Sequence, residues 1–154
     1  MYYNYNYKKE EKWEFTYAVI KDGVETIKKC YPRSKEQIEE NKRICKEKGA
    51  RFISCKKLYP FSTEKNQHNF GLVRNICSNR INDMYIGDIE YDEAEIDRLY
   101  DLKEKADKYF ELPLPVAWLP WEELEEAKEI CAMAVEHRVN KCIENGLYDY
   151  IQYC

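Results

Sequence analysis

Residues 13–30 read WEFTYAVIKDGVETIKKC, and this stretch decides the first half of the fold. Large apolar side chains occupy every second position from Trp13 to Val19, which is the period of a half-buried strand. The sequence KDG at residues 21–23 then favours a tight turn, because glycine adopts positive φ without steric cost. Residues 24–30 return as a second strand, so the stretch predicts a β-hairpin.

The residues that follow the hairpin predict a helix and a third strand. Ser34 and Gln37 fit a capping box, and Gly49 stands where the C-cap of a helix belongs. Apolar residues between them are few among many Lys and Glu, which predicts a helix that lies on the hairpin with its outer face in water. Residues 51–59 then read as a strand that ends at Pro60.

From Ser62 onward, apolar residues recur at steps of three and four, which is the period of a helix. Residues 62–81 therefore predict one helix, and residues 84–88 read as a connector or a short strand. Asp92 can cap a second helix, which must end near Leu112 because two prolines follow.

The last part of the chain predicts a connector and one more helix. Residues 112–121, LPLPVAWLPW, read as an apolar connector stiffened by proline. Pro120 suits the first turn of the last helix, and Gly146 ends it.

These elements together predict an α+β fold. A small three-stranded sheet comes first, in the chain order β-hairpin, helix, strand. A three-helix C-terminal half follows it. We expect a flexible tail rich in Tyr and Asn over residues 1–12, and one compact domain over residues 13–154. Within that domain, residues 13–61 form the basic sheet–helix half, and residues 62–154 form the mainly acidic helical half.

The charges are sorted along the chain. Residues 1–80 carry 18 Lys and Arg against 10 Asp and Glu, whereas residues 81–154 carry 7 against 19. The formal net charge of −4 therefore hides two segments of opposite sign. Such a distribution bears on binding partners and electrostatic fields rather than on the fold.

Common catalytic and cofactor motifs are missing from the sequence. It has no Gly-rich phosphate loop, no GxSxG, no HExxH and no calcium-loop spacing. The seven cysteines include no CxxC pair, which favours reduced thiols in a core over a disulfide framework or a zinc site. No apolar run reaches the ~20 residues that a membrane-spanning helix needs. We therefore expect a cytoplasmic protein without cofactor, metal or membrane contact.

Carboxylates are concentrated along two predicted helices of the acidic half. Such a row can present negative charge to a basic groove on another protein, where electrostatic complementarity speeds association and selects the partner. The alternative is that these side chains only keep two helix faces in water. We assign the following residues to a partner-binding acidic face: Glu90, Asp92, Glu93, Asp97, Asp101 and Glu104.

The aromatic connector offers a second contact surface through Trp118 and Trp121. Together these features predict a small non-enzymatic interaction protein that binds a larger protein or nucleoprotein complex. Its small size, segregated charge and lack of motifs suggest an inhibitor, encoded by a phage or another mobile element, of a host system that handles nucleic acid.

The first alternative is a module that binds DNA or RNA directly through its basic half. Lysines and arginines would bind phosphates there, and aromatic rings would stack on bases. Glutamates on the same predicted helix dilute this field, and neither RRM nor KH motifs are present. The residues assigned to this function are Lys28, Lys29, Arg33, Lys56 and Lys57.

The second alternative is a small enzyme with a site near His68. Residues 62–69 form the densest polar cluster of the chain, at the start of a predicted helix. A histidine there can act near neutral pH, and helix amides can hold an anion. The competing interpretation is a solvated helix start, and we expect no catalytic residue in this chain.

Overall fold

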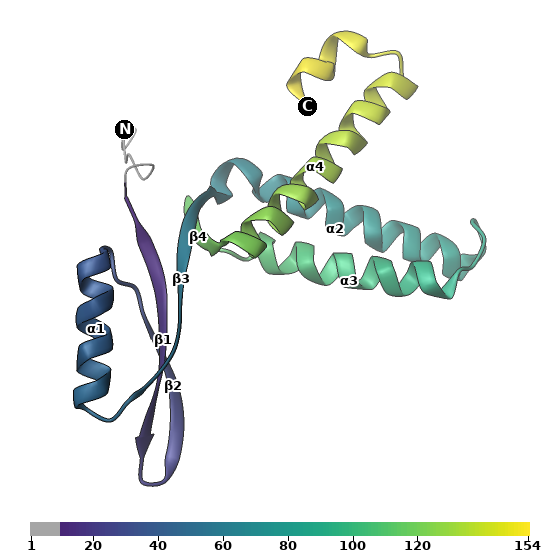
Figure 1. The fold of residues 1–154 in the computed structure, drawn as a ribbon. Helices are drawn as coiled ribbons and strands as arrows, with labels where there is room; N and C mark the ends of the chain where they lie inside the picture. The colour runs from purple at the N-terminus through teal and green to yellow at the C-terminus, as the bar shows by residue number, and fades with distance from the viewer. Residues whose placement is uncertain (1–9) are drawn as a thin grey trace. The chain divides into compact units, whose positions relative to one another are not determined.

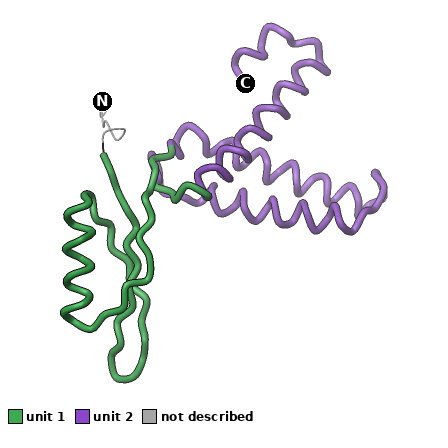
Figure 2. The backbone as a smooth tube through the Cα atoms, viewed as in Figure 1, with its two compact units in different colours: residues 1–61, 118–122 green, residues 62–117, 123–154 purple. Residues whose placement is uncertain are grey.

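The computed structural model describes residues 10–154 and places them in two compact units (Figures 1 and 2). Unit 1 comprises residues 10–61 and Trp118–Glu122, and unit 2 comprises Ser62–Ala117 and Glu123–Cys154. The fold class is α+β, as predicted. The single compact domain over residues 13–154 stays a prediction. Most of the predicted tail, residues 1–9, lies outside the described residues.

The predicted hairpin is confirmed. Strand β1 (Lys12–Lys21) pairs antiparallel with β2 (Val24–Cys30), and the last pair of the ladder joins Lys21 to Val24. The two residues between them have positive φ, 54° at Asp22 and 78° at Gly23. Two consecutive positive φ angles are typical of a type I′ turn, whose twist matches that of the two strands it joins.

Helix α1 (Lys35–Glu47) begins and ends at the predicted residues. The Ser34 hydroxyl oxygen accepts a hydrogen bond from the Gln37 backbone N–H at 3.1 Å. The Gln37 side-chain oxygen in turn accepts from the backbone N–H of Arg33 at 2.7 Å. Gly49, with φ of 72°, follows the last turn in a conformation that favours glycine.

Strand β3 (Arg51–Ser62) pairs antiparallel with the other edge of β1. The register steps from Thr16 opposite Ser54 to Tyr17 opposite Phe52, so β3 has a bulge. This bulge, which the regular alternation of the sequence does not reveal, aligns Phe52 with Tyr17. The Phe52 ring then packs 5.1 Å from that of Phe15, measured between ring centroids.

The core of unit 1 lies between the sheet and α1, beside β1 in Figure 1. Phe15 is fully buried there, together with Trp13 of the same strand. Ile38 and Cys45 of α1 cover them. The helix thus lies on the hairpin with an exposed outer face, as predicted.

The sheet has four strands, and the prediction of three was wrong. Its order is β2-β1-β3-β4, and β4 (Val116–Pro120) comes from the segment predicted to be a connector. Ala117 and Leu119 are buried while Trp118 between them is half-buried, which is the period of a strand. An edge strand tolerates flanking prolines, and those prolines hid the alternation.

Unit 2 contains the three predicted helices and a short fourth one. These are α2 (Thr63–Ile86), α3 (Glu93–Phe110), α4 (Trp121–Glu144, of which the first two residues belong to unit 1) and the 3₁₀-helix η2 (Tyr148–Tyr153), which was not predicted. Figure 1 shows α2 and α3 side by side. The predicted connector or strand at residues 84–88 was wrong for residues 84–86, because buried Met84 continues the apolar face of α2. Residues 87–88 do lie in the connection to α3.

Replacing Phe15 with alanine tests this core directly. We expect Phe15→Ala to lower the free energy of unfolding of unit 1 by about 3–5 kcal/mol, because the substitution leaves a cavity under α1. Tryptophan fluorescence during urea denaturation measures this, since all three tryptophans belong to unit 1. Ile20→Ala, at a residue 65% exposed, is the control and should change stability by no more than about 0.5 kcal/mol. Equal losses in the two variants would contradict the assigned core.

Candidate protein-binding surface

Four of the six predicted acidic residues form one stripe along α3. Glu93, Asp97, Asp101 and Glu104 follow one another at steps of four, four and three residues, so their side chains lie on one helix face. All four are exposed. The opposite face of α3 is the buried one and contains Ile96, Leu99, Ala106 and Tyr109. The stripe therefore points into solvent within unit 2.

The other two acidic residues, Glu90 and Asp92, lie in the loop that leads into α3. The Asp92 carboxylate caps the helix by accepting a hydrogen bond from the Glu95 backbone N–H at 3.2 Å, as predicted. Glu90 and Asp92 line a shallow hollow at the turn between α2 and α3, with Arg80 and Tyr91 also in its wall. All six predicted residues thus belong to α3 or to the loop before it.

Three exposed tyrosines gather at this same end of the α2–α3 pair. Tyr85 comes from the last turn of α2, Tyr91 from the loop and Tyr100 from α3, with exposed fractions of 59%, 55% and 47%. The ring centroids of Tyr85 and Tyr91 are 6.2 Å apart, and Tyr85 shares a side-chain hydrogen bond with Tyr100. These residues were not predicted as functional. Their one signal in the sequence is that three tyrosines flank the acidic loop.

The tyrosines and the carboxylates belong to one electrostatic neighbourhood. Repulsion by the negative charge of the neighbouring Tyr100 phenolate is the largest cause that raises the pKa of Tyr85. Desolvation, the hydrogen bond with Tyr100, Tyr91 and the Asp97 carboxylate all raise it further. Tyr85 therefore keeps its hydroxyl proton at physiological pH and remains a hydrogen-bond donor.

The carboxylates differ in whether an internal cation neutralises them. Glu95 binds Arg98 at 2.6 Å and Arg80 at 3.4 Å, and the hydrogen bond from Arg98 is the main cause that lowers the pKa of Glu95. Asp101 pairs with Lys105 at 3.2 Å.

Three residues of the stripe have no such cation: within residues 10–154, Glu93, Asp97 and Glu104 make no ion pair. Their charge is available to a partner. We call the following set the acidic tyrosine patch: Tyr85, Tyr91, Glu93, Asp97, Tyr100, Asp101 and Glu104.

The two predicted tryptophans lie elsewhere, in unit 1. Trp121 is exposed at the start of α4, and its ring meets the ring of Tyr59 edge-on at 5.4 Å. Trp118 is half-buried in β4, with the Lys12 ammonium 5.7 Å from its ring centroid. The two predicted contact surfaces thus belong to different units.

The basic residues assigned to nucleic-acid binding are largely paired within unit 1. Carboxylates lie 3.3 Å from Lys29, 3.8 Å from Arg33 and 3.7 Å from Lys57. Lys28 and Lys29 are consecutive residues of a strand, so their side chains leave opposite faces of the sheet. Lys56 stands across from Glu14 in the β1–β3 ladder. These five residues therefore do not form one cationic face.

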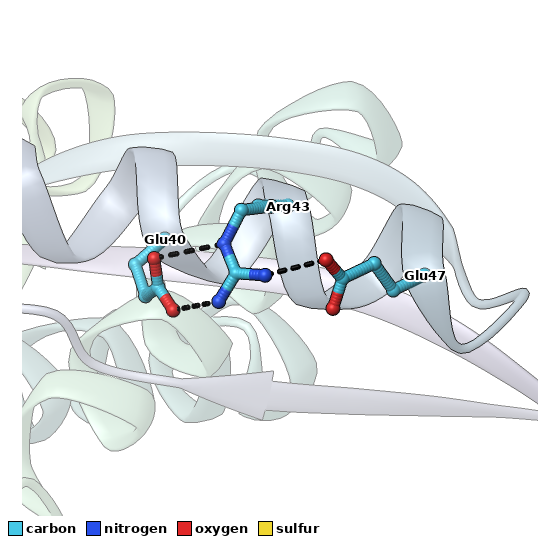
Figure 3. Close-up of polar contacts among 3 residues, drawn as sticks. All are labelled: Glu40, Arg43 and Glu47. Atoms are coloured by element: carbon cyan, nitrogen blue, oxygen red, sulfur yellow. Dashed lines mark hydrogen bonds and ion pairs between the residues drawn. The ribbon is translucent and has the colours of Figure 1, made fainter.

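Helix α1 pairs two of its basic residues with its own carboxylates. The Arg43 guanidinium binds the carboxylates of Glu40 and Glu47, one helical turn away on either side (Figure 3). Lys42 lies 3.5 Å from Glu39. The charges of Lys42 and Arg43 are thus compensated within α1 itself.

The polar residues around His68 include two that stabilise the fold by hydrogen bonds to backbone carbonyls. The Thr63 hydroxyl donates to the Pro113 carbonyl at 2.7 Å, and the Gln67 amide donates to the Phe110 carbonyl at 3.3 Å. His68 itself is exposed on α2. Thr63 and Gln67 are thus engaged with backbone carbonyls of the segment that follows α3 or ends it.

Comparison with known proteins does not place this chain in a family. No protein-family model matches the chain, and comparison with curated proteins and with solved structures finds no match either. Over residues 10–154, no helix is long and apolar enough to cross a membrane. In that same part of the chain, no three His, Cys, Asp or Glu side chains are grouped to hold a metal ion.

The coupling among the tyrosines is testable by titration. We expect Tyr100→Phe to lower the pKa of Tyr85. The substitution removes the hydroxyl of Tyr100, and with it the phenolate charge and the hydrogen bond that raise this pKa. NMR titration of tyrosine rings labelled with ¹³C measures each pKa. Tyr148→Phe, which removes an exposed tyrosine of η2, is the control. An unchanged Tyr85 titration in Tyr100→Phe would contradict the geometry of the patch.

Proposed function

We propose that this chain is a non-catalytic protein-binding module that docks through the acidic tyrosine patch on a basic surface of a larger protein. One observation carries the proposal. Three exposed tyrosines pack together among carboxylates, of which Glu93, Asp97 and Glu104 have no internal counter-ion in residues 10–154.

Tyrosine is a favourable residue for such a contact. Its ring adds a large area at a low cost in side-chain entropy, and tyrosine is enriched among the residues that dominate binding energy. Two further apolar side chains, Ile86 and Ile89, are exposed at the same turn between α2 and α3. Aromatic and aliphatic groups surrounded by charged ones are typical of a binding surface with an apolar centre and a polar rim.

The charge of the patch selects a basic partner. Carboxylates that recur every four residues lie about 6 Å apart along a helix. Lysine and arginine side chains can pair with them, and can also lie over the tyrosine rings in cation–π contacts. A basic surface that normally binds phosphates fits this row. The partner we propose is therefore a protein of a nucleic-acid-handling complex, which the chain would inhibit by occupying that surface in the cytoplasm.

The two alternatives have less support. Direct binding of nucleic acid would require Lys29, Arg33 and Lys57 to exchange their carboxylates for phosphates. An enzyme near His68 that used Thr63 or Gln67 would require these side chains to release the backbone carbonyls that they bind. Both functions stay predictions.

Charge reversal on α3 tests the proposal. The chain is first used to capture its partner from a host extract, and the purified partner is then titrated at about 50 and 300 mM salt. We expect Asp97→Lys combined with Glu104→Lys to weaken binding by about tenfold or more at low salt, and by less at high salt, because it reverses unpaired charges on the patch.

The matched control is Glu129→Lys combined with Glu136→Lys. It makes the same change of charge at two exposed mid-helix residues of α4 in the same unit, and it should bind as the wild type does. Equal losses of affinity in both double variants would show that binding depends only on net charge. That result would contradict the acidic tyrosine patch as the binding surface. DNA or RNA binding at low salt that is lost in Lys28→Glu combined with Lys29→Glu would favour the first alternative instead.

A further inference from the structure

Two thiols of unit 2 face each other where the chain folds back after α4. Cys142 lies in the last turns of α4, and Cys154 follows η2. Their sulfur atoms are 3.9 Å apart, in a contact in which either thiol can donate. Within residues 10–154, no other two cysteines share a hydrogen bond.

The backbone holds this pair in place from both sides. The Leu147 N–H donates to the Cys142 carbonyl at 2.8 Å, and this bond turns the chain back after the helix. The Arg138 guanidinium donates to the carbonyl of Cys154 at 3.0 Å. The Cys154 N–H donates to the Ile151 carbonyl at 3.1 Å. The approach of the sulfurs is thus part of the folded arrangement of η2 on α4.

The other five cysteines are situated differently. Cys45, Cys77 and Cys131 are buried in the cores of their units. Cys30 and Cys55 are half-buried next to the unit 1 core, and burial is the main cause that raises the pKa of each. A reagent in solution has poorer access to the three buried thiols. Cys30 and Cys55 lack the second thiol within hydrogen-bond distance that Cys142 and Cys154 have, among residues 10–154.

We propose that Cys142 and Cys154 form a thiol–disulfide exchange site, which reacts with a low-molecular-weight disulfide and closes to an intramolecular disulfide. This inference is independent of the acidic tyrosine patch. A disulfide has its sulfurs about 2.05 Å apart, so the two side chains must approach by about 2 Å.

The reaction proceeds in two balanced exchange steps. The Cys154 thiolate attacks one sulfur of the small disulfide, so a mixed disulfide forms, the reagent's own S–S bond breaks, and one small thiolate leaves with the proton of Cys154. The Cys142 thiolate then attacks the Cys154 sulfur and releases the second small thiolate, which takes the proton of Cys142. Two protein thiols are oxidised, and one small disulfide is reduced to two thiols.

The order of the two cysteines follows from their surroundings. Desolvation is the main cause that raises the pKa of Cys142, and its contact with Cys154 raises it further. A thiol with a raised pKa forms less thiolate, so we assign the resolving step to Cys142. Closing the bond would pin η2, with its exposed Tyr148, Tyr150 and Tyr153, to the end of α4.

Oxidised glutathione is the probe for the test, applied to the reduced full chain. We expect intact mass to fall by about 2 Da as two thiols become one disulfide. After alkylation of the remaining thiols and proteolysis, the peptides containing Cys142 and Cys154 should be linked. The rate should rise from pH 7 to pH 9, because thiolate is the attacking species. Hydrogen exchange over residues 147–153 should slow in the oxidised chain.

The variants separate the two steps. In Cys142→Ser, the reaction should stop at a mixed disulfide between Cys154 and glutathione. Cys55→Ser is the control and should form the Cys142–Cys154 disulfide as the wild type does. Linkage of Cys142 or Cys154 to any other cysteine, formation of a disulfide between two chains, or full alkylation of both thiols after treatment would overturn the proposal.

Discussion

The arrangement of unit 2 depends on hydrogen bonds between the start of α2 and the segment that follows α3. Pro113 and Pro115 end α3, because proline cannot continue a helix. Their carbonyls then accept hydrogen bonds from the start of α2. The Thr63 hydroxyl and the Glu64 backbone N–H bind them at 2.7 and 3.1 Å. Donors at a helix N-terminus and acceptors of a proline segment thus satisfy each other.

This constraint fixes one end of the α2–α3 pair and leaves the other end to solvent. Gly71 lies next to the fixed end, where a Cβ would make an ordinary van der Waals contact of 3.4 Å with the Phe110 ring. The Arg74 guanidinium covers the same ring at 4.4 Å. At the far end, Tyr85 and Tyr91 have no such cover and are exposed. The fold therefore separates a structural end from a surface that is free to bind.

The charge split of the sequence has a different meaning in the two units. In unit 1, Lys29 and Arg43 lie beside carboxylates that neutralise them, so the excess of basic residues does not make one cationic face. In unit 2, Asp97 and Glu104 stand on the exposed face of α3 without an ion pair among the described residues. An uncompensated charge acts on a partner at longer range than a compensated one. The acidic half is thus the better candidate for recognition.

The sequence predicted what local chemistry determines. Asp22-Gly23 and Ser34 marked a turn and a cap whose geometry depends on those residues alone. It did not predict β4, because Pro115 and Pro120 conceal a short edge strand whose pairing partner lies far away in the sequence.

The acidic residues of the site were predictable because helical spacing places them on one face. The tyrosines were not, since the contact of Tyr85 with Tyr100 requires α2 and α3 to pack in one register. Tertiary packing, which has no local signature, created that part of the surface.

Hydroxyl-radical footprinting of the complex with the captured partner tests whether the acidic tyrosine patch is the contact surface. Each tyrosine is its own reporter, since oxidation of an exposed ring is quantified by peptide mass. We expect Tyr85, Tyr91 and Tyr100 to become protected, while exposed Tyr148 and Tyr153 of η2 react as in the free chain. Unchanged reactivity of the first three, with protection of Trp118 and Trp121 or of the basic half instead, would contradict it.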